Sequence, residues 1–223
     1  TQVKAGTKQE TNDWRVKLSI PSTFGAPEIL APLVETNGLV FPYTPTILIQ
    51  HTANYDALSP THSNYPFPQY QNSQIEDLVI TGDFFCENAK DAQYWTAMVH
   101  YLRSVTKMNY GVDGDAGAPP PIVKLTGYGD FVFPNVPVVV RNFTVDLPAD
   151  VDYIKTQITG DVSITDGSVN VEIPGKAGWA PVQSQVSITV TPIYSRAKTS
   201  QFSLNSFING GYLGSGGNGG GFI

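Results

Sequence analysis

Histidine, cysteine and paired carboxylates are the residues of this sequence that could carry out catalysis or bind a metal ion. The three histidines are His51, His62 and His100, and none has a second histidine at four-residue spacing. A helical zinc motif needs that spacing, so structural roles are the better interpretation for all three. No G-x-S-x-G turn is present, which leaves a Ser–His–Asp triad without support.

The acidic pairs give no stronger signal. Asp113 and Asp115 repeat the opening of a calcium-binding loop, but the further oxygen ligands and the closing glutamate are missing, which favours an ordinary turn. Asp150 and Asp152 are typical of a turn at a strand edge, and nothing else supports a glycosidase-like pair. The glycine-rich stretch 214–221 lacks the lysine of a phosphate-binding loop.

Cys86 is the single cysteine, so an internal disulfide and a cysteine-based metal site are both excluded. No histidine neighbours it in sequence, which favours a packing role over a nucleophilic one. From these residue types we expect a protein that is not an enzyme, with no catalytic residue, no cofactor and no metal site.

Composition favours a β-rich protein. A chain of 223 residues fits one large β domain or two small ones, and 17 prolines with 21 glycines indicate many turns. Charged residues make up 14%, well below the usual quarter, and a weakly charged surface loses its water easily on contact with other proteins. An ordinary soluble β protein explains these values equally well.

Charge and hydropathy exclude two classes of partner. The net charge is −6, and the basic residues are scattered, so specific nucleic-acid binding is not expected. No apolar run approaches the ~20 residues that span a bilayer, and no signal-like segment opens the sequence. We therefore expect that the protein is synthesised in the cytoplasm and does not associate with a membrane.

The elements that would position any site are mostly strands. Alternation predicts a half-buried strand at 14–20, and a strand of buried character that contains Ile75, Leu78, Val79 and Ile80 is predicted to end at Gly82. The region 38–50 is predicted as a strand that Pro42 and Pro45 split or confine to a sheet edge. Residues 21–32 and 51–72 have no period and are predicted as a loop and a long connection.

One amphipathic helix is predicted after Asn88, which is a good N-cap with Asp91 in the capping-box position. The helix is expected to end at Gly111 and to pack a broad apolar stripe on a sheet. The stripe contains Ala92, Tyr94, Trp95, Met98, Val99, Tyr101, Leu102, Val105 and Thr106.

The second half of the chain contains further strands. They are predicted at 122–126, 131–133, 136–145 and 186–190, and the β-branched run 136–145 is typical of a central strand. Residues 161–173 are predicted as a hairpin with a type I′ turn at Asp166-Gly167. That turn pairs Ile164 with Val169 and Val162 with Val171.

The end of the chain differs from the rest. Residues 1–195 are predicted as one domain and 196–223 as a glycine-rich tail that is disordered in isolation. The tail carries four large apolar residues that suit anchoring on another chain, namely Phe202, Leu204, Phe207 and Ile208.

Several segments resemble a known family. They are residues 41–46 (FPYTPT), 60–65 (PTHSNY), 101–108 (YLRSVTKM), 119–125 (PPPIVKL), 136–140 (VPVVV) and 147–153 (LPADVDY). Together they resemble the tube-like baseplate proteins that initiate the tail tube of contractile-tailed bacteriophages. Residues 1–40 and 155–223 carry no matching motif, which leaves the identity of the tail ring open.

The resemblance implies a mainly β fold with one helix (α+β): a tail-tube-like β-sandwich or open barrel with a flanking α-helix, a β-hairpin insertion and extended termini. It implies a structural virion protein that forms a homohexamer around a DNA channel, through which DNA passes without specific binding. Implied neighbours are the tail tube, the baseplate hub, and sheath or wedge components.

Two alternatives stay open from the sequence. One is another tail ring, such as the tail tube or a tube-terminating or joining protein. The other is a carbohydrate-binding or hydrolytic β-sandwich, which would need Trp14, Trp95 and Trp179 to line a cleft beside paired carboxylates. Alternation and helix spacing place Trp14 and Trp95 toward the core, which weakens that reading.

Overall fold

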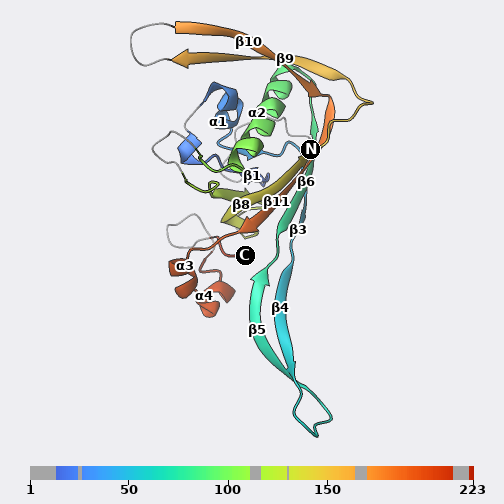
Figure 1. Cartoon of the computed structure of the whole chain (residues 1–223), viewed down its shortest axis with the longest axis vertical. Helices are drawn as coiled ribbons and strands as arrows, with labels where there is room; N and C mark the ends of the chain where they lie inside the picture. The colour runs from blue at the N-terminus through green and yellow to red at the C-terminus, as the bar shows by residue number, and fades with distance from the viewer. Residues whose placement is uncertain (1–13, 25–26, 111–116, 130, 164–169, 213–220) are drawn as a thin grey trace.

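A computed structural model describes residues 14–24, 27–110, 117–129, 131–163, 170–212 and 221–223, with only the backbone described at 157–163 and 170–176. The predictions for 1–13, Gly111, the Asp113 and Asp115 pair, Ile164, Val169, the Asp166-Gly167 turn and the 214–220 glycines lie outside these residues. The described chain is mainly β with a few helices (Figure 1).

The described residues form a seven-stranded antiparallel sheet in the order β2-β1-β7-β8-β11-β6-β3. Its strands are β1 Lys17–Leu18, β2 Leu39–Val40, β3 Thr46–Leu48, β6 Leu78–Phe85, β7 Val123–Gly127, β8 Phe133–Val145 and β11 Gln183–Pro192. The prediction that 136–145 is central is confirmed, because β8 has strands on both sides and buries alternate valines.

The sheet curls so that its two edges approach one another. Its edge strands β2 and β3 are joined by residues 41–45 alone, and a segment that short spans at most about 20 Å. Phe41 crosses this gap and packs on Phe84 of β6, with ring centroids 5.7 Å apart. The predicted splitting of 38–50 by Pro42 and Pro45 is confirmed, and both halves are edge strands.

The long helix α2, Ala89–Val105, packs on the sheet as its apolar stripe predicts. The Asn88 side chain accepts hydrogen bonds from the backbone N–H groups of Lys90 (2.9 Å) and Asp91 (3.0 Å). The Asp91 carboxylate accepts one from the backbone N–H of Glu87, the residue before the N-cap, and not from that of Asn88 as in a capping box. The helix ends at Val105, before the expected Gly111.

Two ring systems of α2 fix the helix to the sheet through polar groups. The Tyr94 hydroxyl donates to the Val40 carbonyl (3.1 Å) and accepts from the Val40 N–H (2.8 Å) in edge strand β2. Trp95 Nε1 donates to Ser184 Oγ in β11 over 2.7 Å. These bonds join the helix to strands that lie far apart in the sheet, so α2 holds the curled sheet together.

Loss of the helix cap should be measurable. Asn88→Ala removes the acceptor of two backbone N–H groups and is expected to lower the free energy of unfolding by about 1 kcal/mol in urea titrations. Lys90→Ala, in the same turn but with the cap intact, is the matched control and should change stability by less than about 0.5 kcal/mol. Equal losses in both variants would contradict the cap's role.

Several predictions from the sequence are wrong. Residues 51–72 are not an irregular connection. They form most of a separate sheet of two strands, β4 His51–Leu58 and β5 Phe67–Ile75. The loop 21–32 and the single-helix expectation are also corrected by short helical elements: η1 Ser22–Phe24, η2 Glu28–Leu30, α1 Ala31–Glu35, α3 Arg196–Ser200 and α4 Leu204–Ile208. These have few turns and therefore little periodicity to detect.

Two local predictions fail for packing reasons. Gly82 does not end its strand, since β6 continues to Phe85, and a Cβ at Gly82 would lie 2.7 Å from the Phe41 ring. The glycine therefore provides room for a buried ring. The strand at 14–20 shrinks to β1, with Val16 buried as predicted, whereas Trp14 is exposed and Arg15 is buried.

Candidate interaction surfaces

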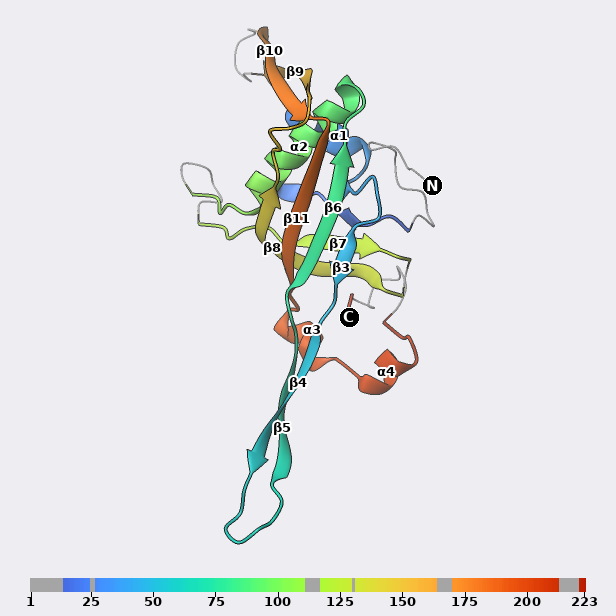
Figure 2. The same cartoon turned by 90° about the vertical axis from the view of Figure 1, so that its right-hand side faces the viewer.

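The hairpin of β4 and β5, called the arm below, projects from the body of the molecule (Figures 1 and 2). It continues the edge strand β3 and its neighbour β6, and pairs His51 with Ile75 at its base and Leu58 with Phe67 at its end. Almost every arm residue is exposed, on both faces of the ribbon. A lone two-stranded ribbon is marginally stable in water, so the arm is a candidate surface for contacts with other chains.

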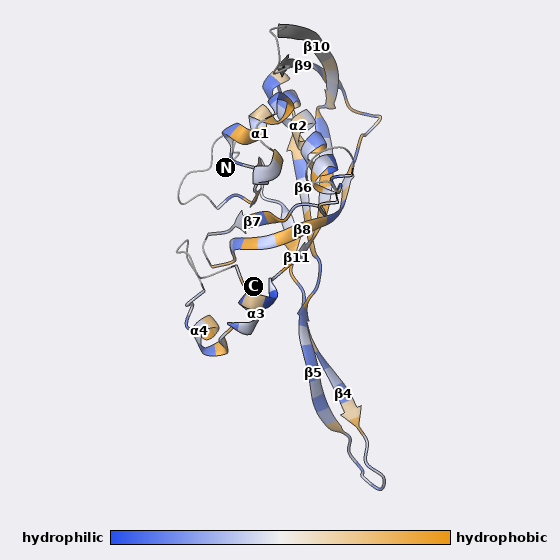
Figure 3. Ribbon diagram, turned by 60° about the vertical axis from the view of Figure 1, so that its left-hand side comes forward, coloured by the Kyte–Doolittle hydropathy of each residue, from blue (hydrophilic) through white to orange (hydrophobic). Residues whose placement is uncertain are grey.

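The two strands of the arm pair along their whole length, but few side-chain contacts join them. Tyr55 and Tyr70 pack edge to face at 5.7 Å, and Asn54 donates to Asn72 over 2.8 Å. In Figure 3, β5 is mostly hydrophilic, while hydrophobic residues recur along the body strands β6 and β8. The arm therefore lacks the continuous buried face by which the body strands pack into the core.

The arm is rich in exposed aromatic and aliphatic side chains and almost free of charge. Exposed large side chains are Tyr55, Leu58, Tyr65, Phe67 and Tyr70. Between His51 and Ile75 the only carboxylate or basic group other than histidine is Asp56. A surface of this kind loses water at little cost, as protein contacts require.

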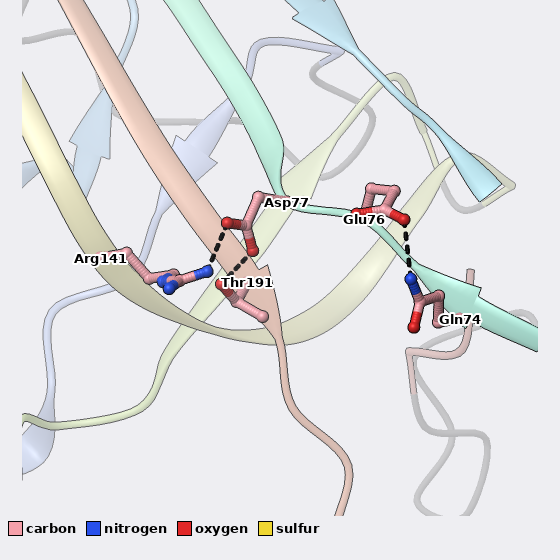
Figure 4. A network of polar contacts seen from close by, with 5 residues as sticks. All are labelled: Gln74, Glu76, Asp77, Arg141 and Thr191. Carbon is pink, nitrogen blue, oxygen red and sulfur yellow. Dashed lines mark hydrogen bonds and ion pairs between the residues drawn. The ribbon is translucent and has the colours of Figure 1, made fainter. Parts of the chain in front are cut away.

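A polar cluster lies where the arm meets the body (Figure 4). The Asp77 carboxylate accepts from Arg141 Nη1 of β8 (2.6 Å) and from Thr191 Oγ1 of β11 (2.5 Å). Next to it, Glu76 accepts from Gln74 of β5 (2.9 Å). The cluster joins the start of β6 to two central strands, so it sets where the arm leaves the sheet.

The two partners of Asp77, Arg141 and Thr191, should contribute unequally to the free energy of unfolding. Thr191→Val removes a hydrogen bond to a carboxylate at a partly buried hydroxyl and is expected to lower the free energy of unfolding by about 1–2 kcal/mol. Arg141→Met should cost less than about 1 kcal/mol, because the Arg141 side chain is 61% exposed. Chemical denaturation of both variants checks the order, and a larger loss for Arg141→Met would contradict it.

The C-terminal segment packs its aromatic rings on one another. Phe202 contacts Phe207 (5.7 Å), Tyr212 (5.7 Å) and Phe222 (5.1 Å), and Phe222 stacks on Tyr194 at 4.6 Å. Of the four residues predicted to anchor on another chain, Phe202 and Phe207 thus pack within their own chain. Leu204 and Ile208 are 62% and 71% exposed and remain free to make outside contacts.

The predicted hairpin of the second half is longer than expected. Its strands are β9 Tyr153–Ser163 and β10 Asn170–Pro181, and the predicted pairing of Val162 with Val171 is confirmed. Thr156 donates to the carbonyl of Ala89 at the start of α2 (3.4 Å), so the hairpin base rests on the helix. The hairpin thus leaves the molecule at the end opposite the arm (Figure 1).

The residues considered for chemistry do not come together. His51 lies at the arm base, His62 at the arm tip and His100 on α2. Within the described ranges, no group of three His, Cys, Asp or Glu side chains could hold a metal ion. Trp95 is 6% exposed and bonded to Ser184, so the three tryptophans do not line a common cleft.

Cys86 is buried, and burial, followed by the nearby Asp91 carboxylate, raises the pKa of its thiol to about 12. With the usual value near 9.0, the thiolate fraction at pH 8 falls roughly a thousandfold on folding. The native protein should therefore react with a disulfide reagent far more slowly than the urea-unfolded chain. A Tyr110→Cys variant, at a position that is 89% exposed and outside the arm, should react rapidly; equal native and unfolded rates for Cys86 would contradict its burial.

Sequence comparisons add no relative: no protein-family model matches the chain, and no curated protein matches it. Among the described residues, no helix has the length and apolar character to cross a membrane. The arm and the C-terminal segment are therefore the structural features that bear most directly on function.

Proposed function

We propose that this chain is a structural protein of a contractile bacteriophage tail that forms a hexameric ring and initiates the tail tube. The arm carries the proposal, because a solvated two-stranded ribbon with exposed strand edges offers a surface that other chains can cover. The resemblance to tube-like baseplate proteins spans residues 41–153, which includes the arm, α2 and the central strand β8.

The arm offers hydrogen-bonding edges to neighbouring copies. Within the described residues, β4 pairs only with β5, so each strand has an outer edge whose backbone groups face solvent. Such an edge takes up another strand readily, and a ring of copies satisfies all edges at once. Side-by-side arms would form a closed wall of strands, continuous with β3 and β6 of each copy.

The curled sheet suits a tail-tube-like open barrel with α2 flanking it. In that arrangement each copy contributes its sheet to the wall of a channel, and α2 faces away from it. The net charge of −6 would discourage DNA from adhering as it passes. One face of the ring would meet the baseplate hub and the other the first ring of the tube, with sheath or wedge components outside.

Two further surfaces supply candidate contacts between copies. The hairpin of β9 and β10, with Val162 and Val171 paired, extends from the end opposite the arm. We also assign Ile208, exposed on α4, to a contact with a neighbouring chain. The corresponding role of Ile164 and Val169 follows from the sequence alone.

Negative-stain electron microscopy of the purified full chain tests the proposal. We expect rings with six-fold symmetry or short tubes, and a monodisperse monomer at high protein concentration would overturn it. Ile208→Glu is a better test of the tail contact than deletion of residues 202–223. Deletion also removes Ile223, which packs against the core, and Gly221, whose carbonyl accepts from Tyr194.

A further inference from the structure

An apolar groove lies at the arm base, between the arm and the C-terminal segment. It has a volume of about 540 Å³, within the range that bound groups occupy in proteins. One wall is formed by His51 to Ala53 and Ser73 to Ile75 of the arm. The other wall is aromatic and aliphatic, from Phe202, Leu204, Phe207, Phe222 and Ile223.

We propose that this groove receives the arm tip, residues 58–67, of a second copy of the chain. The inference rests on the proposed self-assembly and specifies one of its contacts. The composition of the tip matches that of the groove, and the distance between them excludes the tip of the same chain.

The tip and the groove match in charge and polarity. Neither contains a lysine, arginine, aspartate or glutamate, although the chain has 32 such residues. The tip presents Leu58, Tyr65 and Phe67, which are 59%, 79% and 61% exposed. Large apolar side chains without charged neighbours fit a groove that is uncharged and has one largely apolar wall, because no ionised group has to be desolvated.

The tip of the same chain cannot fill the groove. The paired strands run from His51 and Ile75 at the groove to Leu58 and Phe67 at the tip, a length of about 25 Å at 3.3 Å per residue. The donor and the acceptor surfaces therefore lie at opposite ends of one arm. With the arms side by side in a ring, all tips lie at one end and all grooves at the other, so the tip enters the groove of a copy in the next ring of a stack, which is a head-to-tail contact.

Site-directed cross-linking tests the contact. Leu58→Cys and Leu204→Cys are made in separate, differently tagged copies of the full chain, mixed, allowed to assemble and treated with a short bismaleimide. Both positions are exposed, and the native Cys86 is buried, so the added thiols react preferentially. We expect a cross-linked species that carries both tags.

A matched pair of Tyr110→Cys and Leu204→Cys is the control, because Tyr110 is 89% exposed but lies outside the arm. If rings form and the 58–204 yield equals the control yield, the groove contact is overturned while the proposed function stands. If the wild-type chain forms no assembly, the proposed function fails, and the contact fails with it.

Charge exchange provides a second measurement. Leu204→Glu is expected to abolish the 58–204 contact and weaken assembly in light scattering, because it places a carboxylate against the apolar tip. The double variant Leu58→Lys with Leu204→Glu should restore assembly, since the two charges meet across the contact. Assembly unaffected by Leu204→Glu, or no recovery in the double variant, would overturn the proposal.

Discussion

Replacing residues 52–74 with an Asn-Gly turn is expected to convert assembled rings into a folded monomer. The replacement removes the arm but keeps His51 and Ile75, so β3 and β6 can still be joined by a tight hairpin. Assembly is expected to be lost because the exposed strand edges and aromatic side chains proposed to join the copies are absent. Sedimentation velocity measures the change directly, from a hexamer or larger species to a single chain.

The shortened chain should otherwise remain intact. The arm contributes no residue to the hydrophobic core, so circular dichroism and the melting temperature should change little. Tyr110→Ser, which removes an exposed aromatic ring outside the arm, should leave assembly unchanged. Rings that persist without the arm would refute its role, and an unfolded product would require the point variants of the tip instead.

Trp95→Ala is expected to have the largest effect on stability of any single substitution considered. Trp95 lies between α2 and the sheet, is nearly fully buried, and donates to Ser184 of β11. Its removal leaves a large cavity and an unpartnered hydroxyl, with an expected loss of about 3–5 kcal/mol. Since domains are stable by about 5–15 kcal/mol, the variant should be close to unfolding.

Trp179→Ala provides the matched control. Trp179 is 58% exposed on β10, so its removal should change the free energy of unfolding by less than about 0.5 kcal/mol. Urea titrations followed by circular dichroism compare the two variants without relying on tryptophan fluorescence. Similar losses for both would contradict the placement of Trp95 in the core.

Local signals in the sequence predicted the parts of the fold that depend on local physics. Asn88 caps α2 as predicted, because a cap is formed by neighbours in sequence. The register of Val162 with Val171 followed from one turn type. The β-branched run of β8 indicated a central strand, because such a run is typical of a strand with neighbours on both edges, as β8 has in β7 and β11.

The arm could not be found in this way. Strand prediction relies on one buried face, and β4 and β5 are exposed on both, with asparagine, glutamine and Pro68 in place of a β-branched pattern. The signal available was the matched length of two polar segments around the turn at Pro60. That signal indicates pairing but not what the paired strands contact.

The contacts within the candidate surfaces could not be predicted from the sequence for a different reason. Asp77, Arg141 and Thr191 come from three strands and meet only because β6, β11 and β8 are neighbours in the sheet. Phe202 and Phe207 were predicted to anchor on another chain. Phe202 instead packs on Phe222 of its own chain, which lies fifteen residues after Phe207. No local pattern encodes contacts of this kind.

The position of β11 has a consequence for biosynthesis. β11 lies between β6 and β8 but is translated after both, so the centre of the sheet stays open while the ribosome covers the interval from Val145 to Gln183. At roughly 5–20 residues per second this interval lasts on the order of a few seconds. During it, the nascent chain presents the apolar residues of β6 and the valine-rich β8 with no strand between them, so it is exposed to aggregation until β11 is added.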